Sequence, residues 1–550
     1  MEENKSIVWI VTGLVDDGVD GVVCGYACAE NDFQLQVVTA HREGTMNFFP
    51  QNRKRPLSSP LAGSMRGRKM LPGLIDRALT ALRRPTGRPL PAGRPVDVMN
   101  RVQSCLGPAE IPADGMGDDA ALDLLSGLVR RYGIDLSHPK AAAHLQPPPL
   151  AVGVAADMLA SLTNASVDTY DSGPCSVAME RWLIHTLAHA AGLGERAAGV
   201  LTPGGSMSNL LGLMLARDSA NARTGHRNEN EAPKRKVVFC SKLAHFSIQR
   251  ACAVLGLGEA AVIPVEVDDR RRMSLGDLRD KLANLGPHDE AIAVVATAGT
   301  TDFGSVDPLP EIGALCRERG LWFHVDAAYG FGAKWSQRLR TKLEGLAEAD
   351  SITLDLHKLG WQPAACSVLM TRDADLFRSL HRTVAYLNPS DDAEEGFDGL
   401  LGQSLQTTRR GDAIKAIASF LALGERGLGA RIDRCHDAAR HGEKMVRRDP
   451  SLELVHPADL TTVVFRYRPE SEQDEDELNG RLRRCLLERG QALIGRTTVS
   501  HDGAPVTCLK LTITNPDIGP AEVESLLDLV VATGRDLEAE PAIRRQRSAS

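Results

Sequence analysis

The lysine at position 358 stands where a charged side chain is unusual. It follows the apolar, partly β-branched run 352–356 of SITLDLHKLG, a pattern typical of a buried strand, and the chain turns at Gly360. A lysine at the end of a buried strand loses the solvation of its charged form, which exposes a nucleophilic amine. Most lysines are simply solvated, so the neighbours of Lys358 must decide between the two interpretations.

A turn at Gly205 and Ser206 could bind a phosphate group. In TPGGSMSNLLGLMLAR, residues 202–217, this turn directly precedes apolar residues at helical spacing. Backbone amides at a helix N-terminus, with the hydroxyls of Ser206 and Ser208 nearby, form a site for an anion. A Gly/Ser turn before a helix is more often only a cap, and the segment is neither a GxGxxG nor a P-loop pattern.

Asp326 and His245 are two further candidates. Asp326 ends the apolar run of LWFHVDAAYG, and an acid at the C-terminal end of a parallel strand faces the crevice in which α/β folds bind ligands. The alternative is an aspartate that only caps the next turn. His245 lies in KLAHFSIQRAC, where an imidazole can stack on a ring or serve as a hydrogen-bonded structural residue.

These four features together match the needs of one cofactor. A lysine amine, a strand-end carboxylate, a stacking histidine and a phosphate loop, in an α/β chain, are what pyridoxal 5'-phosphate (PLP) requires. No metal or nicotinamide site accounts for all four, and the sequence contains no CxxC motif and no clustered Cys/His set of the zinc type. The pattern therefore predicts a PLP enzyme.

Composition is consistent with an enzyme that acts on small molecules. The 550 residues are 43% hydrophobic and 25% charged, and a net charge of -7 lacks the basic excess of a dedicated nucleic-acid binder. The N-terminal run SIVWIVTGLV is too short to span a bilayer and precedes two aspartates instead of a cleavage site. With eleven scattered cysteines, the sequence favours a reduced, cytoplasmic chain without a membrane or nucleic-acid partner.

The elements that must position these residues are predicted as follows. The runs KVVFC, AIAVVATAG, LWFHVD, SITLDL and CSVLMT alternate with helical patterns, which indicates a mostly parallel α/β sheet buried on both faces. The runs TTVVFRYRP and CLKLTITN predict strands of a smaller α+β lobe. The expected regions are a poorly ordered or variable extension at 1–68, a helical segment at 69–146, the large domain at 147–425, the small domain at 426–535 and a disordered tail at 536–550.

The sequence resembles the group II PLP-dependent amino acid decarboxylases between His138 and Pro516. The motifs that carry the resemblance occur in the family's order: HPKAAAHLQPPPL, NASVDTYDSGPCSVAMERWL, TPGGSMSNLLGLMLAR, TAGTTDFGSVDPL, HVDAAYG, DLHKLGWQPAACS and SLQTTRRGDAIK. The details AHLQPPPL, DLHK, QPAACS and LQTTRR look most like the diaminobutyrate and lysine decarboxylase branch, which is associated with siderophore and polyamine synthesis.

The resemblance implies a set of cofactor-binding residues: Gly205, Ser206, His245, Thr301, Asp326, Ala328, His357 and Lys358. Among these, Lys358 matches the Schiff-base lysine, His245 the histidine that stacks on the ring, and Asp326 the partner of the pyridine nitrogen. His144 and Arg410 are the candidates for substrate binding. The implied fold is fold-type I, and the implied assembly is a homodimer with active sites at the interface and the helices of 69–146 wrapped over the partner.

The implied activity is α-decarboxylation of an L-amino acid to an amine and carbon dioxide. A diamino acid such as 2,4-diaminobutyrate, ornithine or lysine is favoured over aspartate, glutamate or an aromatic amino acid. Acidic residues of SDDAEEGFD could face a substrate ammonium, although such a run is more often a solvated surface. Arg409 and Arg410 could bind a carboxylate or be purely structural.

Three departures from the family pattern affect these expectations. The stretch LNPSDDAEEGFDGLLGQSLQTTRR lacks the tyrosine that helps to protonate the carbanion in some relatives, and Phe397 lies near that place. This is either branch variation, with His245 or water as proton donor, or a sign of decarboxylation coupled to oxidative deamination that gives an aldehyde. Gly411 and Leu359 replace bulkier residues, which alters either the substrate pocket or only local packing.

Overall fold

The computed structural model describes residues 8–11, 22–29, 32–39, 59–83, 85–224, 234–501 and 503–540. They fall into two compact units, the first formed by 1–83 with 94–132 and the second by 84–93 with 133–550. Much of the predicted extension at 1–68, and residues 541–550 of the predicted tail, lie outside the described residues. The boundary at 146 and the other predicted domain limits stay predictions.

The first unit contains a small sheet and three helices. Strands β1 (Val8–Val11), β2 (Val22–Ala29) and β3 (Asp32–Thr39) form an antiparallel sheet in the order β1-β2-β3. The helices are α1 (Met65–Thr80), α2 (Pro95–Leu106) and α3 (Asp118–Tyr132). Arg77 of α1 forms an ion pair of 2.6 Å with Asp123 of α3. Helix α2 buries none of its side chains.

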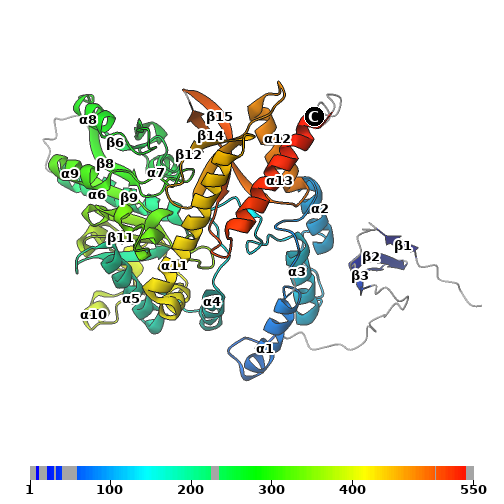
Figure 1. The fold of residues 1–550 in the computed structure, drawn as a ribbon. Coiled ribbons are helices and arrows are strands. Elements are labelled where there is room, and N and C mark those ends of the chain that lie inside the picture. The colour runs from blue at the N-terminus through cyan, green and yellow to red at the C-terminus, as the bar shows by residue number, and fades with distance from the viewer. Residues whose placement is uncertain are drawn as a thin grey trace, which may run out of the picture. The chain divides into compact units, whose positions relative to one another are not determined.

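A seven-stranded sheet forms the centre of the second unit (Figure 1). Its strands, in spatial order, are β5 (Ala198–Thr202), β11 (Ser367–Thr371), β10 (Ser351–Asp355), β9 (Trp322–Asp326), β8 (Asp289–Thr297), β6 (Arg235–Ser241) and β7 (Val262–Val265). Only β11 runs antiparallel to its neighbours. The five apolar runs predicted as strands form β6, β8, β9, β10 and β11, which confirms the mostly parallel α/β sheet.

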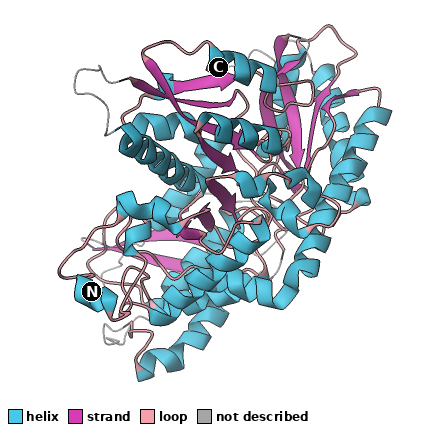
Figure 2. Cartoon of the chain, turned by 90° about the vertical axis from the view of Figure 1, so that its left-hand side faces the viewer, coloured by secondary structure: helices cyan, strands magenta, loops and turns pink. Residues whose placement is uncertain are grey.

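Helices cover both faces of this sheet, as Figure 2 shows for the cyan helices around the magenta strands. Alternate residues of β6 enter two separate apolar clusters. Val238 and Cys240 pack with α6 (Gly205–Thr224) and α7 (Ser247–Val254), whereas Val237 and Phe239 belong to the opposite cluster. That second face is covered by α5 (Pro174–Ala191), α9 (Leu309–Arg319) and α11 (Ala413–Arg448). Burial on both faces explains why the strands read as continuous apolar runs.

The remaining elements of this part are short. They are α4 (Ala151–Thr163), α8 (Leu275–Ala283), α10 (Ser390–Glu394) and the 3-10 helices η1 (Glu259–Ala261), η2 (Gly330–Trp335), η3 (Arg340–Leu343), η4 (Leu346–Glu348), η5 (Ala374–Leu380) and η6 (Leu401–Gln403). No helix among the described residues combines the length and the apolar character needed to cross a lipid bilayer.

A second, five-stranded sheet forms the predicted smaller α+β lobe. Its order is β12 (Leu452–His456), β13 (Thr462–Tyr467), β15 (Ala504–Thr512), β14 (Leu493–His501) and β4 (Ala141–Ala142), with α12 (Glu475–Glu488) and α13 (Pro520–Ala539) packed against it. Figure 1 shows α11 in yellow extending from the central sheet to this lobe. A kink at Gly424, with φ of 60°, divides α11 next to the predicted boundary at 425.

Candidate active site

The candidate residues gather at one edge of the central sheet. The parallel strands β5, β6, β8, β9 and β10 end at this edge, and Gly205, His245, Asp326 and Lys358 lie at or just after these ends. Carboxyl ends of parallel strands are the usual ligand-binding edge of an α/β sheet. The strand order therefore brings together residues that are up to 153 positions apart in the sequence, from Gly205 to Lys358.

Lys358 lies against an aspartate that sequence analysis did not include in the site. Its Nζ atom is 2.8 Å from Oδ2 of Asp355, whose side chain is only 3% exposed. Ser367 of the neighbouring strand β11 donates a hydrogen bond to Oδ1 of the same carboxylate. A Cβ atom added to Gly205 would lie 2.9 Å from that Oδ1. Glycine is therefore needed at 205 because the turn closely approaches Asp355.

Asp326 is held by two nitrogen donors. Nδ2 of Asn209, in the first turns of α6, donates to Oδ2 at 2.8 Å, and the backbone amide of Ala328 donates to Oδ1 at 3.1 Å. The carboxylate and the amide side chain are both buried. These contacts fix the orientation of the carboxylate at the end of β9.

The pKa of His245 depends on burial and on the charged residues around it. Burial lowers its pKa, Asp326 and Asp355 oppose this effect, and Lys358 and Arg250 add to it. Both charged candidates therefore act on the pKa of His245, whose predicted role stays a prediction. Its Nδ1 atom is 2.8 Å from the hydroxyl of Ser247, the first residue of α7.

A second histidine, His324, lies in the interior behind Asp326. Its Nε2 atom is 3.0 Å from Oδ1 of Asn209, and its Nδ1 atom is 2.7 Å from the hydroxyl of Ser351. Complete burial lowers its pKa to about 4, so the ring is neutral near pH 7. A Cβ atom on Gly212 of α6 would lie 2.7 Å from this ring, which explains a glycine inside the helix.

The turn before α6 has the geometry of an anion site. Gly204 adopts φ of 122°, and its carbonyl accepts the amides of Met207 and Ser208. The first amides of any helix have no partner within the helix, and here they belong to Gly205 and Ser206. Within the turn, the hydroxyls of Thr202 and Ser208 are 2.6 Å apart.

His357 lies beside the same aspartate as Lys358. Its Nε2 atom is 3.8 Å from Oδ2 of Asp355, and its Nδ1 atom is 3.1 Å from the carbonyl oxygen of Cys366. The half-buried ring therefore belongs to the cluster at the end of β10, although its predicted phosphate role stays a prediction.

Thr301 and His144 both interact with Lys510. The Lys510 ammonium is 2.8 Å from Oδ1 of Asp302 and 3.4 Å from the carbonyl oxygen of Thr301. Burial, and then Lys510 and Arg483, lower the pKa of His144. The described contacts do not join either residue to the Lys358 cluster, and both predicted roles stay predictions.

Each of the two arginines of LQTTRR pairs with carboxylates of this chain. Arg409 forms a buried pair of 2.6 Å with Glu180 of α5, and that carboxylate also accepts the amide of Leu201 in β5. Arg410 donates to Asp157 at 2.6 Å and also pairs with Asp412. These contacts favour the structural interpretation of Arg409, whereas substrate binding by Arg410 stays a prediction.

Both positions that carry smaller residues than the family pattern, Gly411 and Leu359, make close packing contacts. A Cβ atom on Gly411 would lie 2.6 Å from the hydroxyl of Ser176, and Leu359 is buried to 2% exposure against Gly332. Phe397, by contrast, is exposed and meets Tyr170 edge-on, with 5.6 Å between the ring centres.

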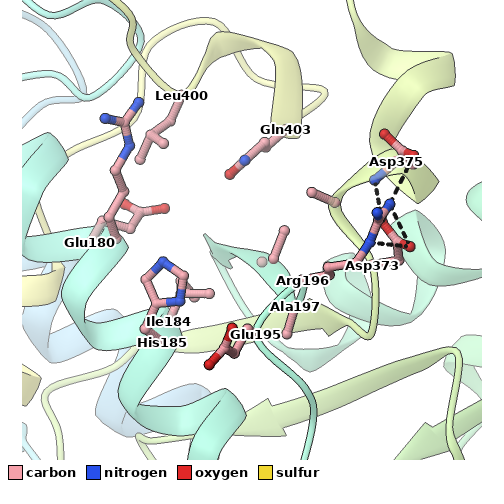
Figure 3. A pocket seen from close by; sticks show the side chains of 14 residues that line it. Glu180, Ile184, His185, Glu195, Arg196, Ala197, Asp373, Asp375, Leu400 and Gln403 are labelled. Atoms are coloured by element: carbon pink, nitrogen blue, oxygen red, sulfur yellow. Dashed lines mark hydrogen bonds and ion pairs between the residues drawn. The ribbon is translucent and has the colours of Figure 1, made fainter.

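A pocket of about 330 Å³ lies elsewhere in the second unit (Figure 3). Glu180, Ile184 and His185 of α5 line it together with Leu400 and Gln403. Arg196 points toward Asp373 and Asp375 at its side and pairs with both. None of the residues predicted for the active site is among those that line it.

The cluster at the strand ends fits PLP on the structure's own evidence. Free amides at the start of α6 suit the phosphate. Because Gly205 closely approaches Asp355 and has no side chain, residue 205 leaves the space in front of these amides open. A buried carboxylate suits the pyridine nitrogen, and an amine suits the aldehyde. Asp326, Lys358 and His245 would supply these groups, with the flat imidazole available for stacking.

Comparisons with known proteins agree with this assignment. The family model described as the pyridoxal-dependent decarboxylase conserved domain matches residues 127–468. L-2,4-diaminobutyrate decarboxylase of Rhizobium meliloti is 38% identical over 434 residues, 78% of this chain and 85% of that protein. The protein of the same name from Acinetobacter baumannii is 36% identical over 435 residues, 76% and 84% of the two chains.

A solved structure extends the likeness to the fold. The glutamate decarboxylase domain of diaminobutyrate-pyruvate transaminase and L-2,4-diaminobutyrate decarboxylase from Vibrio parahaemolyticus superposes with a TM-score of 0.76 at 29% identity, covering 86% of this chain and 97% of that one. The expected fold-type I architecture is therefore confirmed. The chain belongs to the family of pyridoxal-dependent decarboxylases and is a PLP-dependent carboxy-lyase that acts on an amino acid.

Proposed function

We propose that this enzyme removes the α-carboxyl group of a diamino acid, with L-2,4-diaminobutyrate ahead of ornithine and lysine. The observation that supports this choice is the 38% identity to L-2,4-diaminobutyrate decarboxylase over 78% of the chain. Loss of carbon dioxide from 2,4-diaminobutyrate leaves 1,3-diaminopropane, a product that fits the siderophore or polyamine role expected from the sequence.

Each member of the cluster has a distinct task in this proposal. PLP, when bound, supplies a ring that accepts the electron pair left by the departing carboxyl group. Lys358 supplies the amine that anchors the cofactor. The carboxylate of Asp355 positions this amine, with Nζ 2.8 Å from Oδ2. Asp326, oriented by Asn209 and the Ala328 amide, would face the pyridine nitrogen and keep a proton on it.

His245 is proposed to cover one face of the ring and to hold the proton needed at the substrate carbon. The stretch from Leu387 to Arg410 contains no tyrosine, so no phenol of this stretch can serve that purpose. Ala328 is proposed for the opposite face, and Thr301 for the wall of the site. The helix start at Gly205 and Ser206, with His357, is proposed to bind the phosphate.

A substrate screen tests the proposed activity. The purified protein, supplied with PLP, is given 2,4-diaminobutyrate, ornithine, lysine, aspartate, glutamate and aromatic amino acids, and carbon dioxide and amine are measured together. We expect kcat/KM to be highest for 2,4-diaminobutyrate. A higher kcat/KM for an acidic or aromatic amino acid would overturn the substrate assignment but leave the reaction class intact.

The exposed surface of α4 supports a homodimer. Gly153, Ala156 and Ala160 face the interior, yet the outward positions are also apolar, with exposure between 38% and 50% at Val152, Val154, Met158, Leu159 and Leu162. An exposed apolar surface of this kind commonly marks an interface with another protein. A second copy of this chain, with active sites at the interface as the sequence implied, is the proposed cover.

We propose a cytoplasmic location because the described cysteines form no disulfides. The nine cysteines whose side chains the structure describes are all free thiols, and six of them are buried. Chains of oxidising compartments commonly pair such residues as disulfides.

A further inference from the structure

One chain of hydrogen bonds connects Asp326 with His245 through the interior of the second unit. Asn209 Nδ2 donates to Asp326 Oδ2 at 2.8 Å and to the Ser247 hydroxyl at 2.9 Å. The Ser247 hydroxyl in turn lies 2.8 Å from His245 Nδ1. Asn209 and Ser247 are 1% and 2% exposed, so water does not compete for these bonds.

The chemistry of the partners fixes the direction of every bond. A carboxylate only accepts, so the amide nitrogen of Asn209 must face Asp326 and the amide oxygen must face His324. His324 therefore carries its proton on Nε2, which lies 3.0 Å from that oxygen and 3.5 Å from the Thr353 hydroxyl. Its bare Nδ1 atom accepts from Ser351 at 2.7 Å, and Ser351 accepts from Trp322 Nε1 at 2.8 Å.

The same reasoning sets the proton on His245. Ser247 accepts from Asn209, so its own hydrogen is free to be donated to His245 Nδ1. The backbone amide of Ser247 also points to that nitrogen, at 3.3 Å, and an amide can only donate. Two donors on Nδ1 leave Nε2 as the nitrogen that carries the proton of the neutral ring.

The structure assigns a positioning role to Asn209 and Ser247: they lock the carboxylate of Asp326 and the Nε2-protonated form of His245 into one rigid unit. The inference rests on the roles proposed for Asp326 and His245. The Asn209 amide donates one hydrogen to each branch. A side chain without an amide at this position would therefore lose at least one branch. His324 keeps the amide from turning over.

Four variants test the two branches separately. Asn209→Leu removes both branches at similar volume, and Asn209→Asp keeps the shape but places a second carboxylate beside Asp326. Ser247→Ala removes only the branch to His245. Asn479→Leu is the matched control, because Asn479 is also buried and also bonded through both amide atoms, but to Tyr467 in the small lobe.

The first measurement is the dissociation constant of PLP, from visible absorption during titration of the apoprotein. We expect both Asn209 variants to weaken binding by about tenfold or more, with Ser247→Ala and Asn479→Leu within about threefold of the native protein. If the Asn209 variants bind PLP as tightly as Asn479→Leu does, the inference is wrong. Asn209→Asp keeps the test valid if the leucine variant does not fold.

The second measurement is the pH dependence of kcat. Asp326 and Asp355 favour the protonated ring of His245, while Lys358 and Arg250 favour the neutral ring, and Ser247→Ala leaves all four in place. Loss of a donor to Nδ1 destabilises the neutral ring, so the limb due to His245 should move to higher pH by about half a unit. A profile that superimposes on the native one would contradict the branch to His245.

Failure of the proposed roles has a different signature. If the native protein forms no visible band with PLP, or if Asp326→Ala binds PLP as tightly as the native protein, then the role of Asp326 is wrong and the inference falls with it. If both behave as expected and Asn209 matches its control, only the positioning role is wrong.

Discussion

The Nζ atom of Lys358 lies 2.8 Å from Oδ2 of Asp355, three residues before it at the end of β10. The pair explains how an ammonium group is tolerated at the end of a buried strand, because a nearly buried carboxylate balances its charge. Ser367 and Gly205 enclose the same carboxylate, so the lysine, the strand pair β10–β11 and the phosphate turn meet at Asp355.

Replacement of Lys358 separates its covalent role from its charge. Lys358→Ala should bind PLP without forming the visible band of a lysine adduct and should lower kcat by at least about a thousandfold. Lys358→Arg keeps a positive charge beside Asp355 and should be equally inactive. Absorption spectra and borohydride trapping distinguish the two roles, and trapping of PLP on Lys358→Arg would show that another amine is the anchor.

A methyl group at Gly205 should weaken the cofactor site. In Gly205→Ala the new carbon would meet Asp355 Oδ1 at 2.9 Å and Oδ2 at 3.1 Å, so the turn or the carboxylate must move. We expect the dissociation constant of PLP to rise by about tenfold. Gly276→Ala is the control, since its nearest neighbour, the Ser274 hydroxyl, is 3.9 Å away, and this helical position should be neutral or gain up to about 1 kcal/mol.

His324 should make the protein sensitive to acid. Burial lowers its pKa to about 4 in the folded protein, against 6.5 as its ordinary value, so the unfolded chain binds more protons between these two pH values. Stability should therefore fall as pH drops from 6.5 to 4, by up to about 3 kcal/mol for this group. Urea unfolding of His324→Gln should show a lower stability at pH 7 but a shallower pH dependence. The exposed residue His288, changed to Gln, should keep the native slope.

The strands, and the grouping of the candidate residues at their ends, were predictable from sequence because each has a local signal. Continuous apolar runs predict strands covered on both faces, and polar residues at their ends mark the ligand edge. Asn209, Ser247 and His324 carry no such signal, because a polar residue in a helix or strand does not reveal which partner it will face. Asp355 could have been found from its spacing to Lys358.

The same reasoning explains the residues whose interpretation stayed open. The pair Arg409–Glu180 joins positions 229 residues apart, a separation that local patterns cannot anticipate. Gly411 could alter either the substrate pocket or local packing, and its close approach to Ser176 could not be anticipated from sequence. The strand β4 joins the second sheet from far upstream and has only two residues, too few for a periodic pattern.

The dimer proposal predicts the effect of one charge on α4. Leu159→Asp places a carboxylate on a surface that is half exposed in the single chain, at 50%, and should be covered in the dimer. The variant should sediment as a monomer in analytical ultracentrifugation and lose activity if active sites need both copies. Val254→Asp, the same kind of change at a residue of α7 with 68% exposure, should remain dimeric. A native monomer would contradict the proposal.

Product stoichiometry decides between simple decarboxylation and aldehyde formation. Oxidative deamination would consume oxygen and water and release aldehyde, ammonia and hydrogen peroxide together with carbon dioxide, whereas simple decarboxylation gives one amine for each carbon dioxide. We expect simple decarboxylation, because it requires a proton donor near the substrate carbon and His245 is connected to Asp326 through Ser247 and Asn209. Phe397 is exposed and rests on Tyr170, outside the described contacts of this cluster. Phe397→Tyr should therefore leave the ratio of amine to carbon dioxide unchanged, and peroxide formed by the native protein but not by this variant would establish the alternative.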